Sequence, residues 1–116
     1  MTTQLKIESH MEGQYAAVLS LSGEVDVANV ARVREAALKL LERQIKRLIV
    51  DLSNVEYMDS SGLGALVALL KRVRESGGQM PLAGAKPRVR RLFEITGLDQ
   101  IFSLHEDVPA ALKEGE

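Results

Sequence analysis

The sequence lacks cysteine and has few aromatic residues. None of its 116 residues is cysteine or tryptophan, and phenylalanine and tyrosine together make up 3% of the chain. The absence of cysteine excludes a disulfide scaffold, a thiolate zinc site and a cysteine nucleophile. With so few aromatic rings, a stacking surface for single-stranded nucleic acid is hard to build. The core of the fold must therefore consist of aliphatic side chains.

The sequence also lacks an excess of one charge and a long apolar run. Lys and Arg number 15 against 16 Asp and Glu, which gives a net charge of -1. Direct nucleic-acid binding normally needs a basic surface, so we expect none. The longest apolar run, residues 63–70, is far shorter than the roughly 20 residues that cross a bilayer, and residues 1–12 contain no signal-peptide core. We therefore expect a cytoplasmic protein without membrane insertion.

Five stretches of the chain have the pattern of β-strands. Apolar residues alternate with polar ones on both sides of residues 12–13, which predicts a hairpin of two strands. The aliphatic run at residues 48–52 predicts a central strand covered on both faces, followed by an irregular polar segment. Weaker patterns predict strands at residues 79–84 and 101–104. Pro81 suits an edge strand or a strand end because proline lacks a backbone donor.

Apolar residues spaced by three and four predict the helices. The first begins near Asp26, whose carboxylate we expect to cap it, and the second begins near Ser60 or Ser61. The remaining helices are predicted at residues 86–97 and 108–113. The element order is therefore β-β-α-β-α-β-α-β-α, which indicates an α/β fold with a mixed sheet.

Nothing in the sequence divides this pattern into two parts. No repeat, low-complexity tract or flexible linker interrupts it, and the length is typical of one compact domain. We therefore expect a single domain over residues 1–116, with an ordered core at about residues 5–112 and frayed final residues.

Motifs for nucleotide binding and catalysis are incomplete. Gly62 and Gly64 begin like a dinucleotide-binding fingerprint, but Val67 occupies the position of the third glycine. The two histidines, His10 and His105, are isolated in the sequence, and we expect both at the surface. No general base, metal constellation or activated nucleophile stands out. We therefore expect no enzyme activity, no cofactor and no metal.

One polar segment leads directly into an apolar helix and contains two adjacent hydroxyls. Ser60 and Ser61 follow Asp59 at the predicted start of the second helix. One interpretation is helix capping, in which a serine accepts hydrogen bonds from the first turn and Asp59 favours the positive end of the helix dipole. A second interpretation is phosphorylation, since a helix N-terminus tolerates an added anion. The residues alone leave both open.

Four sequence blocks resemble the STAS domain, and in particular stand-alone bacterial anti-sigma factor antagonists. They occur in the family's order and span most of the chain. The blocks are GEVD at residues 23–26, LIVDLS at 48–53, YMDSSGLG at 57–64 and VRRLFEITGL at 89–98. The resemblance implies a STAS fold for the whole chain.

The resemblance also implies a function and a site. In this family, the serine that follows the aspartate, here Ser60, is phosphorylated by a partner anti-sigma factor that is itself a serine kinase. The unphosphorylated antagonist binds that partner and frees the sigma factor, phosphorylation ends the binding, and a serine phosphatase resets the cycle. Asp26 matches the acidic residue beside the acceptor. The remaining partner-binding residues implied are Asp59, Ser61, Gly62, Leu63 and Gly64.

Two other functions are also compatible with the sequence. A STAS domain can be a scaffold subunit of a signalling or transport complex, where it docks partners without a kinase cycle. Alternatively, the chain is a small-molecule binding module, for a nucleotide or a lipid. Such a module would use Gly62, Gly64 and the N-terminus of the second helix as an anion site.

Overall fold

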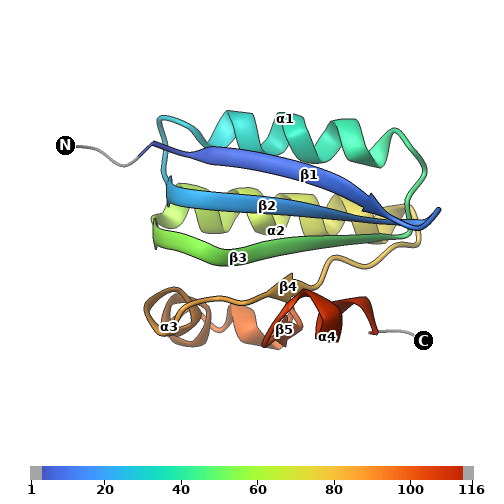
Figure 1. The fold of residues 1–116 in the computed structure, drawn as a ribbon. Helices are drawn as coiled ribbons and strands as arrows, with labels where there is room; N and C mark the ends of the chain where they lie inside the picture. The colour runs from blue at the N-terminus through green and yellow to red at the C-terminus, as the bar shows by residue number, and fades with distance from the viewer. Residues whose placement is uncertain (1–3, 114–116) are drawn as a thin grey trace.

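Five strands form one mixed sheet (Figure 1). The computed structural model describes residues 4–113. The strands are β1 (Lys6–Glu12), β2 (Ala16–Val25), β3 (Arg47–Met58), β4 (Leu82–Ala83) and β5 (Leu104–His105). They lie in the order β1-β2-β3-β4-β5; β1 is antiparallel to β2, and the other neighbours are parallel. The predicted mixed α/β sheet is confirmed, whereas the fraying predicted for the final residues falls on 114–116, outside the described residues.

The helices cover both faces of the sheet. They are α1 (Val30–Leu41), α2 (Ser60–Glu75), α3 (Pro87–Ile95) and α4 (Val108–Leu112), and a short 3-10 helix, η1 (Leu98–Gln100), follows α3. Buried side chains of α1, α2 and α3 share one apolar cluster with Leu19 of β2. Ala111 of α4 packs with Val18 and Ile49 in a second cluster. Because Val18 and Leu19 point to opposite faces, α4 covers the face opposite the other three helices.

The predicted hairpin and central strand are confirmed, but β3 is longer than predicted. It continues through residues 53–58, which we expected to be irregular. The pairing with β2 shifts twice, because Ser20 and Ser22 face Asp51 and Asn54, and Gly23 and Glu24 face Val55 and Tyr57. Each shift inserts one extra residue into β3. The extra residues break the alternation of apolar and polar positions by which a strand is detected.

The two C-terminal strands differ from the prediction in position. Strand β4 lies between β3 and β5, so the prediction that it is an edge strand is wrong. Pro81 instead precedes the strand, where its carbonyl accepts a hydrogen bond from the Val50 N–H at 3.0 Å. Strand β5 begins three residues later than predicted. Phe102, inside the predicted strand, lies before β5 and is buried against the Phe93 ring in an edge-to-face contact with centroids 5.5 Å apart.

His10 is at the surface as predicted, whereas His105 is not. His10 is exposed and lies 2.9 Å from the Glu12 carboxylate, and His105 is half-buried in β5.

Among residues 4–113, no helix combines the length and apolar character needed to cross a bilayer.

Candidate functional site

The candidate site lies where β2 and β3 end side by side. Val25 and Met58 are the last residue pair of these parallel strands, and Asp26 and Asp59 follow them directly. The Asp59 N–H donates to the Val25 carbonyl at 3.1 Å, which joins the two strand ends. Polar groups at the carboxyl ends of neighbouring parallel strands are well placed to form a site. Two segments 33 residues apart in sequence therefore meet at one edge of the sheet.

The Asp59 carboxylate connects both segments of the site. Its Oδ1 atom accepts a hydrogen bond from the Gly62 N–H at 3.1 Å, and its Oδ2 atom accepts one from the Val27 N–H at 3.2 Å. Asp59 is thus the N-cap of α2, not Ser60 or Ser61 as the capping interpretation predicted. The reason is positional: Ser60 already occupies the first helical turn, one residue beyond the cap.

Asp26 orders a turn and does not cap a helix. Its Oδ1 atom accepts a hydrogen bond from the Ala28 N–H at 2.9 Å, and its own N–H donates to Asn29 Oδ1 at 3.0 Å. Helix α1 begins only at Val30, with Asn29 at the N-cap position, so the predicted start near Asp26 is wrong by four residues. A side-chain acceptor that bonds two residues onward favours a turn over a helix.

Asn29 is a member of the site that the sequence reasoning missed. Its side-chain amide donates to the Glu24 carbonyl at 2.9 Å, while its side-chain oxygen accepts from the Asp26 N–H. The amide thereby closes the turn over the end of β2. A signal was present, because asparagine is favoured both in turns and directly before helices. The continuous apolar spacing that begins at Val27 concealed it.

The two serines differ in accessibility. Ser60 is exposed at the first position of α2, whereas Ser61 is half-buried. The first N–H groups of a helix lack intrahelical partners and form the positive end of the helix dipole. Ser60 therefore presents its hydroxyl to solvent at an end of a helix that tolerates negative charge. An approaching enzyme can reach it without unfolding the domain.

The two glycines of the segment have different surroundings. A Cβ atom on Gly62 would lie 2.6 Å from Met58 Cγ and 3.0 Å from Val25 Cγ1, so the start of α2 touches the strand ends closely. The Gly64 position is exposed and has no heavy atom within 4 Å of such a Cβ. Leu63, between them, is buried and belongs to the core. Gly62 and Leu63 thus have packing roles, and Gly64 faces open space.

Exposed apolar side chains and one ion pair surround these groups. Val27 is 75% exposed in the turn after β2, and Tyr57 is 47% exposed near the end of β3. Also near the end of β3, Glu56 Oε1 lies 2.5 Å from the Lys86 ammonium. Such exposed apolar side chains add buried apolar area when another protein covers them.

The arrangement combines an exposed hydroxyl with two carboxylates that backbone N–H groups hold in place. The carboxylates of Asp26 and Asp59 already accept hydrogen bonds from backbone N–H groups. Within residues 4–113, no three histidine, aspartate or glutamate side chains converge as metal ligands. Backbone hydrogen bonds therefore hold both carboxylates of the site in place.

Comparison with known proteins identifies the family. A family model of the STAS domain matches residues 7–111. The chain belongs to the STAS domain family. Among curated relatives of this STAS protein, an anti-sigma F factor antagonist of Paenibacillus polymyxa is 32% identical over 117 residues, covering 100% of this chain and 97% of its own. An anti-sigma-B factor antagonist of Staphylococcus aureus is 34% identical, covering 88% and 94%.

A solved structure agrees with this assignment. The crystal structure of an anti-sigma factor antagonist from Mycobacterium paratuberculosis superposes on the STAS protein with a TM-score of 0.85 and 28% identity, covering 94% of this chain and 92% of the other. The fold and the family that the four sequence blocks implied are both confirmed.

Proposed function

We propose that this STAS protein is an anti-sigma factor antagonist that binds its partner through the site at the ends of β2 and β3. The names of the curated relatives support this function, and both relatives match over most of their length. The partner would cover the exposed Val27 and Tyr57 and reach the first turn of α2. Burying these apolar side chains would contribute most of the affinity.

Ser60 is the phosphate acceptor in this proposal, and the anti-sigma factor is the kinase. The observation that carries the assignment is that Ser60 is exposed at the first position of α2, while Ser61 is half-buried. In the transfer, the Ser60 Oγ atom forms a bond to the terminal phosphorus of ATP, ADP leaves, and the hydroxyl proton passes to the kinase or to solvent. A serine phosphatase then hydrolyses the phosphoserine and restores the hydroxyl.

The phosphate changes the surface while leaving the fold in place. A phosphoserine adds about -1.5 to -2 charges. Because Ser60 is exposed, the dielectric around it is close to that of water, about 80, and each unit of that charge about 6 Å from a carboxylate is repelled by about 0.7 kcal/mol. The positive end of α2 offsets about 0.3 to 1 kcal/mol of this, or about 2 kcal/mol where the site is partly buried. The net repulsion inside the domain is small enough for the core to tolerate.

The carboxylate that the new charge meets is fixed in position. Asp59 cannot turn away from the phosphate without releasing the N–H groups of Gly62 and Val27. A partner surface shaped for a neutral hydroxyl would also have to remove water from the dianion, which is expensive without a matching cation. Each 1.4 kcal/mol of that penalty lowers the affinity tenfold. The switch is therefore local to the first turn of α2.

Phosphate mapping tests the acceptor assignment. The purified protein is incubated with its cognate anti-sigma factor and ATP, and the modified residue is located by mass spectrometry. Ser60→Ala should abolish the modification, while Ser61→Ala serves as the matched control and should retain it. Modification that persists in Ser60→Ala, or that maps to Ser61, would contradict the assignment.

A further inference from the structure

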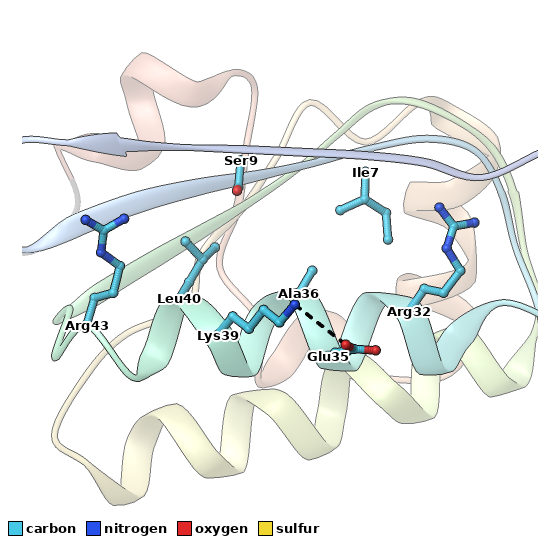
Figure 2. A pocket seen from close by; sticks show the side chains of 8 residues that line it. All are labelled: Ile7, Ser9, Arg32, Glu35, Ala36, Lys39, Leu40 and Arg43. Atoms are coloured by element: carbon cyan, nitrogen blue, oxygen red, sulfur yellow. Dashed lines mark ion pairs between the residues drawn. The ribbon is translucent and has the colours of Figure 1, made fainter.

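A groove separate from the Ser60 site runs between β1 and α1 (Figure 2). It has a volume of about 500 Å³ and is lined by Ile7 and Ser9 of β1, by five residues of α1 between Arg32 and Leu40, and by Arg43 just after α1. Ile7 projects from β1 toward the helix, and Leu40 points from α1 toward β1. Ala36 lies between them and completes an apolar floor. The groove shares no lining residue with the ends of β2 and β3.

One wall of the groove is the edge of the sheet. In the described part of the chain, β1 pairs with β2 on one side and with no strand on the other. An edge strand has a row of unpaired backbone N–H and C=O groups that can accept another strand. Arg32 reaches this wall, since its Nη1 atom donates to the Leu5 carbonyl at 3.1 Å. A strand added to β1 would therefore run beside a cation.

The other wall is positively charged. Arg32, Lys39 and Arg43 line it against a single carboxylate, Glu35, so three positive charges face one negative and two remain in excess. Lys39 and Glu35 lie 3.7 Å apart with both side chains largely exposed, so their pair is weak and easily exchanged. From Arg32 to Lys39 the cations span about 10 Å of α1, about the length of a three-residue strand, and Arg43 follows in the turn after α1.

We propose that this groove binds an extended acidic segment of a partner protein, which adds to β1 as a sixth strand. Backbone hydrogen bonds to β1 would provide affinity, and acidic side chains at alternate positions would face the three cations of the groove. The aliphatic parts of those side chains would rest on Ile7, Ala36 and Leu40. The surface lies apart from Ser60, so it can be occupied whether or not the phosphorylation cycle operates.

A second copy of the chain is the competing occupant, and the charges of the groove disfavour it. Two β1 strands paired antiparallel about Ser9 would set Lys6 opposite Glu12 and Glu8 opposite His10, which is favourable. The same pairing would bring together two grooves that each carry two excess positive charges. An acidic segment neutralises this charge, whereas a second copy doubles it.

Titration of the full chain with a defined peptide tests the proposal. The probe is an end-blocked hexapeptide of alternating glutamate and valine, followed by amide chemical shifts of the isotope-labelled protein. Binding should perturb β1 and α1, and Lys39→Gln/Arg43→Gln should weaken it about fivefold. The matched control is Arg34→Gln/Lys71→Gln, which removes two exposed cations outside the groove and should stay within twofold. Equal weakening in both variants would show that the peptide does not bind through the cations of the groove, which would overturn the proposed site.

Two further probes separate strand addition from simple charge attraction. A hexapeptide N-methylated at every residue keeps its charge but has no backbone N–H to donate along either edge, so it should bind at least fivefold more weakly. Equal binding would overturn strand addition. Equal binding of an alternating lysine–valine peptide would overturn the preference for an acidic segment. Sedimentation of the protein alone should show a monomer at the titration concentration. A dimer that the glutamate peptide fails to dissociate would assign the edge to a second copy.

Discussion

Val27 and Asp59 lie 32 residues apart in sequence and are joined by a hydrogen bond of 3.2 Å from the Val27 N–H to Asp59 Oδ2. The other oxygen of the same carboxylate caps α2 through the Gly62 N–H. One side chain therefore fixes the turn after β2 relative to the helix that begins with Ser60. This connection explains how an exposed hydroxyl and an exposed apolar side chain can form one surface with a defined shape.

Substitutions of Asp59 should show how much its two hydrogen bonds stabilise the fold. Asp59→Ala loses both acceptors and should lower the free energy of unfolding by about 2 kcal/mol. Asp59→Asn keeps one oxygen for the cap but places an amide opposite one donor, so the loss should be about 1 kcal/mol. Urea denaturation measures both values. If both variants were as stable as the wild type, the two hydrogen bonds of Asp59 would not stabilise the fold, which would contradict this prediction.

The two glycines should respond in opposite ways to alanine. Gly62→Ala forces a methyl group against Met58 and Val25 and should destabilise the protein by about 1 to 3 kcal/mol. Gly64→Ala enters open space in a helix and should stabilise it by about 0.5 to 1 kcal/mol. Thermal or urea unfolding checks the order. A stable Gly64→Ala variant that has lost partner affinity would place Gly64 inside the interface.

Asp26→Asn should separate the structural role of this residue from its charge. The asparagine oxygen can still accept from the Ala28 N–H, so the stability should change by less than about 0.5 kcal/mol. We expect the rate of Ser60 phosphorylation or the affinity for the anti-sigma factor to change, because the charge beside the acceptor is gone. If stability, rate and affinity all stay the same, Asp26 serves only the turn.

Val27→Ser should weaken partner binding without affecting the fold. The side chain is 75% exposed in the free protein, so its removal should alter stability by less than about 0.5 kcal/mol. Loss of its burial against the partner should lower affinity by about tenfold. Ile95→Ser, at a position 69% exposed on α3, is the matched control. Calorimetric titration should show that it binds like the wild type; equal losses in both variants would contradict the assigned surface.

The fold could be predicted from the sequence wherever the apolar spacing is regular. The helix predicted at residues 86–97 agrees with α3 to within two residues at each end. Pro87 favours the first turn of this helix, and Gly97, with φ of 75°, follows its end. The strand predicted at residues 48–52 is shorter than β3, because the buried residues Leu52, Val55 and Met58 follow one another every third residue and do not alternate with polar ones. That spacing arises from two register shifts against β2, and pairing between distant segments is not encoded in local alternation.

The site could be predicted in composition but not in its connections. The blocks around Asp26 and Asp59 predicted the residues of the candidate site, and the apolar spacing that follows Ser60 placed it at a helix start. The assignment of the cap required knowledge of which residue is first in the helix. The partner of the second Asp59 oxygen lies on another strand, so only the sheet topology brings Val27 within its reach. Contacts of this kind depend on tertiary structure.

The most direct test of the account is the affinity of the anti-sigma factor for the protein before and after stoichiometric phosphorylation of Ser60. Isothermal titration calorimetry of the two forms, at one salt concentration, gives the two dissociation constants. The account predicts that the phosphorylated form binds at least tenfold more weakly while its unfolding free energy changes by less than about 1 kcal/mol. Equal affinities of the two forms would contradict it.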